Sequence, residues 1–174
     1  MRPDDRETLD RLVSEHHPRM LRLATRLTGR LETAEEIIQE ALLRATRSWS
    51  GFRSQSDFKT WVTRIILNVF HDWLAKQRKS SALEDVPDLR HADPPSCAMA
   101  EELGRYIADR VSALPPRQRE VLILLTYEGL TASEASQLLN IQVANVYATL
   151  YEARQRLRAE LAPFLAENCH EERS

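Results

Sequence analysis

The stretch LPPRQREVLILLTYEGLTASEASQLLNIQVANVYATLYEARQRLR, residues 114–158, decides the fold of the second half of the chain. Pro115 and Pro116 suit the first positions of a helix, where no backbone N–H is needed. The inner face of this predicted helix carries Val121, Leu122, Leu124 and Leu125. Gly129 predicts its end, because glycine readily adopts the left-handed conformation.

Two further helices are predicted after Gly129. Thr131 and Glu134 form a capping-box pattern, which starts a helix, and Asn140 suits the turn that ends it. The last helix has apolar residues at intervals of three or four, namely Val146, Leu150, Ala153, Leu157 and Leu161. This order is a helix-turn-helix, whose second helix typically enters the major groove of DNA. Units of this kind also bind proteins, so a purely structural role stays open.

The composition predicts an all-helical chain that does not cross a membrane. Only 4 of the 174 residues are glycine, and runs of β-branched residues are few. The longest apolar run, Val121–Leu125, is far too short to span a bilayer. The charged start, MRPDDRETLDR, has no apolar signal core, so a cytoplasmic location is expected. Cys97 and Cys169 have no metal-binding spacing and cannot make a disulfide framework.

The charge is unevenly distributed along the chain. The net charge of −2 divides into +4 for residues 1–79, −4 for 80–113, +1 for 114–158 and −3 for 159–174. The segments with regular helical patterns are therefore the positive ones. This asymmetry indicates modest binding to a polyanion.

The first part of the chain is predicted to form two helices before residue 49. The first covers 6–29, and Pro18 is expected to kink or split it. Thr33 and Glu36 form a second capping-box pattern, which predicts a helix from Ala34 to Ser48.

A third helix, 58–79, has the strongest periodicity. Its apolar residues recur in steps of three and one: Phe58, Trp61, Val62, Ile65, Ile66, Val69, Phe70, Trp73 and Leu74. Ser56 or Asp57 can cap its start. The opposite face is expected to show Lys59, Thr60, Thr63, Arg64, Asn68, Asp72, Lys76, Arg78 and Lys79.

The chain is predicted to contain two small helical domains, 6–79 and 96–162. Residues 80–95 between them hold three prolines and several acidic residues, so a flexible linker is expected. Ser96 can cap the first helix of the second domain. Residues 163–174 begin with proline and are expected to form a frayed tail.

Two surfaces of the first domain carry candidate contacts. The acidic face of the second helix either compensates the helix dipole or docks a basic partner helix; it holds Glu35, Glu36, Gln39 and Glu40. The third helix and the loop before it either hold splayed bases and phosphates or form a solvated charged face. Their candidates are Phe52, Arg53, Gln55, Arg64, Asn68, Lys76, Arg78 and Lys79.

The last helix of the second domain carries the candidate contacts to duplex DNA. Its outward residues near the start are Gln142, Ala144, Asn145, Tyr147, Ala148 and Thr149. Amides can read adenine edges, and Ala or Thr can touch a thymine methyl group. Arg154, Arg156 and Arg158 follow as phosphate contacts or solvated charges.

Catalysis and cofactor binding are not expected. Glu167 and His170 have a metal-ligand spacing, but a bundle site needs two such pairs, and this one lies in the expected tail. The sequence has no Gly-rich phosphate loop or nucleophile elbow.

The order of the segments resembles the sigma factors of bacterial RNA polymerase. An acidic helix, TAEEIIQEALLRA (33–45), precedes FKTWVTRIILNVFHDWLAKQRK (58–79), an acidic linker and LPPRQREVLILLTYEGLTASEASQLL (114–139). The length and the two domains are similar to the extracytoplasmic-function (ECF) group. The resemblance covers about residues 10–160, and it implies a region 2 helical bundle and a region 4 helix-turn-helix.

The resemblance also implies roles and partners. The acidic residues Glu35, Glu36, Gln39 and Glu40 match the stretch that docks on the clamp helices of the polymerase's largest subunit. The loop at 52–57 and the helix bearing Arg64, Asn68 and Asp72 match the parts that melt and read the minus-ten element of promoter DNA. The last helix of the second domain would read the minus-thirty-five element. An anti-sigma partner is implied by family habit.

The recognition helix departs from the family pattern. Basic residues are common in the family where Tyr147, Thr149 and Glu152 stand, and Asn140 replaces a turn glycine. We therefore expect a different promoter sequence or a weaker hold on the upstream element.

Two alternative functions are consistent with the same sequence. A stand-alone helix-turn-helix regulator would bind a two-fold symmetric site as a dimer, without polymerase. A protein-binding helical adaptor would show no salt-dependent binding to DNA.

Overall fold

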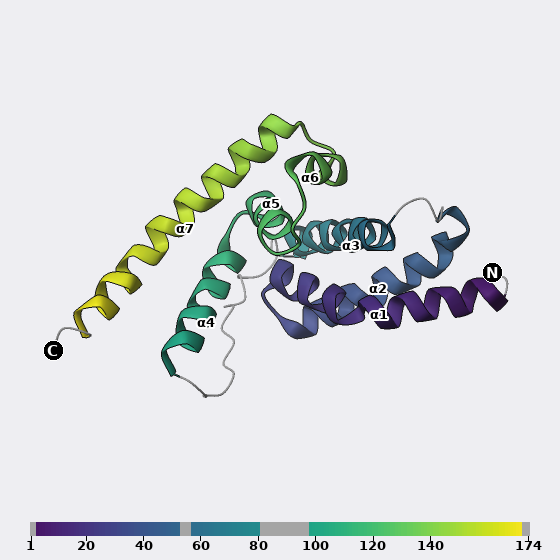
Figure 1. The fold of residues 1–174 in the computed structure, drawn as a ribbon, viewed down its shortest axis with the longest axis horizontal. Helices are drawn as coiled ribbons and strands as arrows, with labels where there is room; N and C mark the ends of the chain where they lie inside the picture. Colours follow the sequence, from purple (N-terminus) through teal and green to yellow (C-terminus); the bar gives the residue numbers. More distant parts are fainter. Residues whose placement is uncertain (1–2, 53–56, 81–97, 172–174) are drawn as a thin grey trace. The chain divides into compact units, whose positions relative to one another are not determined.

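The computed structural model describes residues 3–52, 57–80 and 98–171, and within these ranges it contains helices and turns but no strand. The all-α prediction is confirmed. The chain divides into two compact units, Met1–His91 and Ala92–Ser174 (Figure 1).

The first unit is built on three helices that pack on one another. They are α1 (Pro3–Thr28), α2 (Leu31–Ser48) and α3 (Phe58–Ser80), with a short 3-10 turn, η1 (Trp49–Gly51), after α2. Their shared core contains fully buried side chains from each helix: Met20, Leu23, Leu27, Ile37, Ala41, Val62, Ile66 and Phe70.

The turn between α1 and α2 differs from the prediction. Helix α2 begins at Leu31, three residues early, so Thr33 lies inside its first turn and does not cap it. Thr28 organises the turn instead, since its hydroxyl donates to the Ala24 carbonyl at 2.9 Å and accepts from the Arg30 N–H at 3.3 Å. Gly29, with a φ of 75°, supplies the left-handed step that the turn needs.

Helix α1 continues through Pro18 as one element. Of the two predicted effects of Pro18, a kink or a split, the split does not occur. A proline inside a helix removes one backbone hydrogen bond. The buried side chains Met20, Leu23 and Leu27 that follow Pro18 pack the second half of α1 into the core, which favours a continuous helix.

Helix α3 buries a wider face than its pattern predicts. Thr63 was expected on the polar face, but it is 1% exposed and accepts a hydrogen bond from Arg19 Nη2 at 3.5 Å. Leu67 is also buried. The reason is that α3 packs against both α1 and α2, so its buried face extends around the helix. At its start, Asp57 Oδ1 accepts from the Lys59 N–H at 3.1 Å, as expected for a cap.

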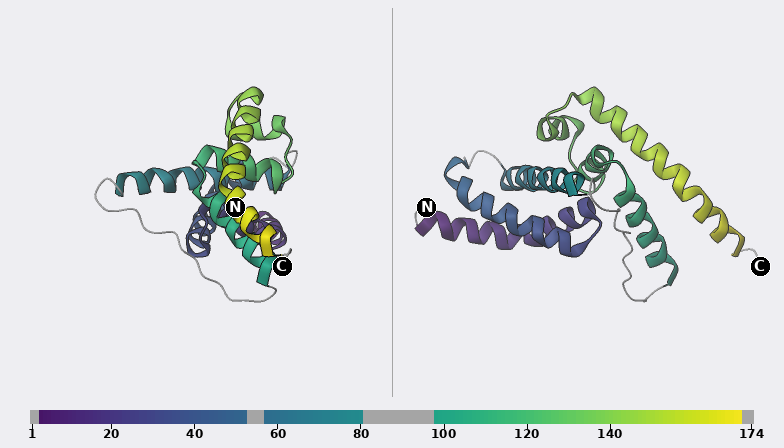
Figure 2. Two further views of the ribbon diagram at one scale, coloured as in Figure 1. Left: turned by 90° about the vertical axis from the view of Figure 1, so that its left-hand side faces the viewer. Right: turned by 180° about the vertical axis from the view of Figure 1, so that it is seen from behind.

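The second unit contains α4 (Ala98–Ala113), α5 (Pro116–Thr126), α6 (Ala132–Leu139) and the long α7 (Val143–Glu171). Helices α4, α5 and α6 all contact α7, which is the longest helix in both views of Figure 2. The three predicted helices of residues 114–158 are thus confirmed, and Pro116 occupies the first turn of α5.

The turns around α6 follow the predicted chemistry. Gly129 has a φ of 68°, and Asn140 has a φ of 52°. Thr131 and Glu134 form the predicted capping box: Thr131 Oγ1 accepts from the Glu134 N–H at 3.2 Å, and Glu134 Oε2 accepts from the Thr131 N–H at 2.7 Å. These turns set the direction of α7 relative to α5 and α6.

The expected frayed tail is instead helical as far as Glu171, because α7 continues through Pro163. Tyr106 of α4 holds this part of the helix. Its ring stacks on Phe164 at 4.5 Å between centroids, and its hydroxyl donates to the Glu160 carbonyl at 3.2 Å. These tertiary contacts offset the hydrogen bond that Pro163 removes.

We predict that Thr131→Ala lowers the free energy of unfolding of the second unit by about 1 kcal/mol, because it removes one side of the capping box. Urea titrations followed by far-UV circular dichroism measure the helix content of the whole chain. Tryptophan fluorescence reports on the first unit alone, since Trp49, Trp61 and Trp73 all lie there.

The matched control is Ser133→Ala, a change at an exposed position of α6. The fluorescence transition should stay in place for both variants. The prediction fails if the dichroism transition of Thr131→Ala coincides with that of Ser133→Ala.

Candidate nucleic-acid and partner interfaces

The acidic face of α2 is exposed at three of its four predicted docking residues. Glu35, Glu36 and Gln39 face solvent, and within the described part of the chain no ion pair engages either of these two carboxylates. Glu40 is half-buried and already paired. Among the described residues, Glu35 and Glu36 therefore have no ion-pair partner, whereas Glu40 is paired with Arg44.

Glu40 belongs to an ion-pair network that joins α2 to α3. Arg44 Nε donates to Glu40 Oε1 at 2.7 Å, and Arg44 Nη1 donates to Asp72 Oδ2, also at 2.7 Å. The hydrogen bond from Arg44 lowers the pKa of Glu40, and the hydrogen bonds to Glu40 and Asp72 raise the pKa of Arg44. The Glu40 carboxylate is therefore held in the ionised form.

The network changes what Asp72 can do. Asp72 was predicted to contact minus-ten DNA, but its Oδ2 already accepts from Arg44, so part of its acceptor capacity is used inside the unit. A carboxylate also repels phosphate. The geometry supports a role for Asp72 in holding α3 against α2.

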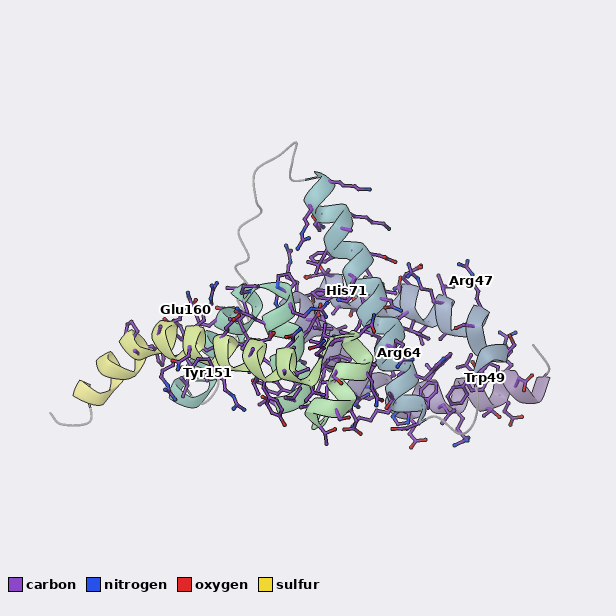
Figure 3. The ribbon with its side chains drawn as sticks, turned by 90° about the horizontal axis from the view of Figure 1, so that it is seen from above. Arg47, Trp49, Arg64, His71, Tyr151 and Glu160 are labelled. Carbon is purple, nitrogen blue, oxygen red and sulfur yellow. The ribbon has the colours of Figure 1, made fainter. Side chains whose placement is uncertain are left out.

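The solvent-facing side of α3 is suited to nucleic acid. Arg64 and Asn68 are exposed and lie one turn apart, and the basic residues Lys76, Arg78 and Lys79 are exposed toward the end of the helix. Figure 3 shows Arg64 and His71 along this helix. An amide and several cations in one row can bind bases and phosphates of a single strand.

An aromatic cluster fixes the point where the loop before α3 begins. Phe52 stacks on Trp49 at 5.0 Å and lies 4.9 Å from Trp61 between ring centroids. Phe58 completes the cluster, 6.0 Å from Phe52. Phe52 is therefore packed against other rings and is half-buried, so only part of its ring is exposed to a base. The predicted contacts Arg53 and Gln55 lie outside the described residues.

The start of α7 presents the predicted duplex-reading residues to solvent. Gln142, Ala144, Asn145, Tyr147 and Ala148 are exposed, and Thr149 is half-buried. Val146 and Leu150 hold the opposite side of the helix in the core.

The structure adds one residue to this face, Tyr151. Its side chain is 65% exposed, more than the 61% of Tyr147 (Figure 3). With about 100° per residue, it falls on the outward line with Ala144 and Ala148. That spacing was visible in the sequence, and the residue was missed because the prediction stopped at Thr149.

The arginines of α5 and α7 divide into two groups. Arg154, Arg156 and Arg158 are exposed, as predicted for phosphate contacts. Arg117 instead donates to the buried carboxylate of Glu120 at 3.1 Å. Arg119 donates to the Leu114 carbonyl at 3.0 Å, and burial lowers its pKa. Of these five arginines, the three of α7 are exposed, have no ion-pair partner among the described residues, and lie on the helix predicted to contact DNA.

Glu152, which stands where the family commonly has a basic residue, contacts α5. Gln118 Nε2 donates to Glu152 Oε2 at 3.2 Å. Glu152 is exposed, so it places a negative charge beside the residues predicted to read the duplex. This geometry fits the expected departure from the family's mode of upstream binding.

No described helix combines the length and apolarity that a membrane crossing needs. Within the same residues, no group of three or more His, Cys, Asp or Glu side chains could hold a metal ion. Cys97 lies outside the described residues, as do the side chains of Glu167, Cys169 and His170.

Comparison with known protein families identifies the family to which the chain belongs. Residues 12–80 match the family described as Sigma-70 region 2, and residues 104–157 match Sigma-70, region 4. The chain belongs to the sigma-70 family. The two matches fall on the α1–α3 unit and on the helix-turn-helix unit respectively.

Curated relatives place this sigma factor in the ECF group. It is 30% identical over 164 residues to the ECF sigma factor SigE of Mycolicibacterium smegmatis, a match that covers 91% of the chain but 63% of that relative. It is 29% identical to SigM of Bacillus subtilis over 154 residues, covering 87% and 94% of the two chains. The Haemophilus influenzae sigma-E factor is 27% identical, with 92% and 91% covered.

Solved structures share the fold. The sigma factor RpoE of Bartonella quintana, solved with the anti-sigma factor NepR, has a TM-score of 0.78 at 22% identity, with 90% of this chain and 98% of that chain covered. CnrH, solved with the cytosolic domain of CnrY, has a TM-score of 0.66 at 23% identity, with 91% and 90% covered.

The Glu40–Arg44–Asp72 network predicts a pH dependence. Because Arg44 lowers the folded-state pKa of Glu40, ionised Glu40 stabilises the fold above its unfolded pKa of about 4.3. This contribution is lost as the pH falls through the lowered folded pKa. Glu40→Gln should therefore reduce the difference in unfolding free energy of the first unit between about pH 7 and pH 3.

Urea unfolding followed by tryptophan fluorescence at the two pH values measures this difference. Glu36→Gln is the matched control for the loss of one carboxylate from α2. An identical acid response of the two variants would contradict the role of the network.

Proposed function

We propose that this sigma factor binds core RNA polymerase and directs it to specific promoters. The observation that carries the proposal is the presence of two exposed faces with different chemistry, one in each sigma-matched unit. The α3 face offers an amide and cations for a single strand, and the start of α7 offers amide, tyrosine and methyl groups for a duplex. Initiation requires both kinds of contact.

We propose that the two units have different roles in transcription initiation. Residues 6–79 dock on the polymerase through α2 and capture the melted minus-ten element through α3 and the loop at 52–57. Residues 96–162 place the complex by reading the minus-thirty-five element with α7. The weak net basicity of the chain is tolerable because the polymerase supplies much of the contact to phosphate.

An anti-sigma partner is proposed to control this sigma factor. RpoE of Bartonella quintana and CnrH share its fold and were solved with the anti-sigma factor NepR and with the cytosolic domain of CnrY, respectively. The chain is proposed to act in the cytoplasm, where polymerase and promoters are. Its role is that of an initiation factor and not of an enzyme, with no cofactor of its own.

Transcription from a genomic library with purified components tests the proposal. Core polymerase plus this chain should yield promoter-dependent transcripts that core polymerase alone does not, and footprints should weaken as salt rises. The proposal is abandoned if no template responds. A footprint on a two-fold symmetric site without polymerase would instead support a stand-alone regulator.

We predict that Asn145→Ala relaxes promoter preference at one upstream base pair. A bidentate contact from Asn to adenine discriminates by about 1–3 kcal/mol, and Asn145 is exposed in the first turn of α7. Selection by the holoenzyme from promoters randomised across the upstream element measures the preference.

Gln155→Ala is the matched control, since it removes another exposed amide nearly three turns further along α7. Unchanged upstream preference in Asn145→Ala would show that Asn145 does not read a base.

A further inference from the structure

Helix α2 carries a large apolar side chain in solvent, Leu43. It is 54% exposed, although α2 has a full buried face of its own made by Ala34, Ile37, Ile38, Ala41 and Ala45. The core of the first unit therefore does not need Leu43. A single exposed leucine is common, so its position relative to the neighbouring side chains decides what it can do.

Leu43 lies on the same side of α2 as the candidate docking residues. With about 100° per residue, it is within about 40° of both Gln39 and Glu36 around the helix axis. Gln39 precedes it by one turn, and Glu36 by two turns. The solvent-facing side of α2 is therefore acidic at Glu36, polar at Gln39 and apolar at Leu43.

The carboxylates on this face differ in whether they are available to a partner. Within the described chain, no ion pair engages Glu35 or Glu36. Glu40 is different, because its carboxylate holds Arg44, which also holds Asp72. A basic partner would thus meet free carboxylates at Glu35 and Glu36, and a paired one at Glu40.

We propose that Leu43 is the apolar anchor of the polymerase-docking surface, which consists of Glu35, Glu36, Gln39 and Leu43. This inference rests on the proposed function and names an apolar contact that contributes to its affinity. Glu40 is a positioning residue that acts through Arg44 on α3. The partner is a helix of core polymerase that presents basic side chains beside an apolar patch, because this chemistry complements two carboxylates next to a leucine.

The two parts of the surface should contribute differently. Exposed carboxylates at a rim mainly steer association and are screened by salt. An apolar side chain buried at the centre of an interface contributes affinity that salt does not screen. Removing Leu43 should therefore weaken binding at every salt concentration, whereas removing Glu36 should weaken binding mainly at low salt.

The chain offers a matched control for the leucine. Leu31 is on the same helix and is 47% exposed, but it lies about 120° from Leu43 around the axis. Both residues face solvent, so serine at either position should leave the fold intact. Tryptophan fluorescence and far-UV circular dichroism of both variants verify this.

The experiment measures the affinity of the full chain for core polymerase, purified from the bacterium that encodes it, at two salt concentrations. Leu43→Ser should weaken binding roughly thirtyfold, as the loss of a hot-spot residue does, with the salt dependence of the unaltered chain. Leu31→Ser should bind like the unaltered chain. Glu36→Gln should reduce the salt dependence.

The outcomes separate this inference from the proposed function. If the unaltered chain does not bind core polymerase, the proposed function itself fails. If it binds and Leu43→Ser binds equally well, only the anchor is wrong. Equal losses in Leu43→Ser and Leu31→Ser would also overturn the anchor, because the effect would then not depend on the face of the helix.

Discussion

The packing of α3 against both α1 and α2 is the constraint on which the first unit depends. Val62, Ile66 and Phe70 are completely buried, so one side of α3 is committed to the core. Arg64 and Asn68 must then face solvent, because each lies two residues after one of these buried side chains. The orientation of the proposed nucleic-acid face is thus a geometric consequence of the hydrophobic contact.

In the second unit, two residues in the left-handed backbone conformation determine how the helices follow one another. Gly129 and Asn140 allow α5, α6 and α7 to follow one another through short turns. Val146, Leu150 and Ala153 then bury one side of α7, which leaves Asn145, Tyr147 and Tyr151 outside. Asn140 performs this task without being glycine, since its short polar side chain tolerates the left-handed region.

Local patterns predicted most of the helices, whereas contacts between distant residues explain several of the errors. The capping box at Thr131 and Glu134 could be read directly, because both partners lie within four residues. The same pattern at Thr33 and Glu36 gave a wrong start for α2, because the turn formed by Thr28 and Gly29 lets the helix begin at Leu31. The helical course of α7 past Pro163 depends on Tyr106, which is more than fifty residues away. The pairing of Glu40 and Asp72 through Arg44 could not be seen in helix periodicity for the same reason.

The arginine at position 44 also has an evolutionary consequence. It connects the helix proposed to meet the polymerase with the helix proposed to meet the promoter. Replacing it with a neutral residue would leave both carboxylates without the cation that hydrogen-bonds to them, so positions 40 and 72 would come under pressure to change together. Lineages of this sigma factor should therefore exchange these three residues as a group, and shifts in promoter choice could accompany shifts in polymerase fit.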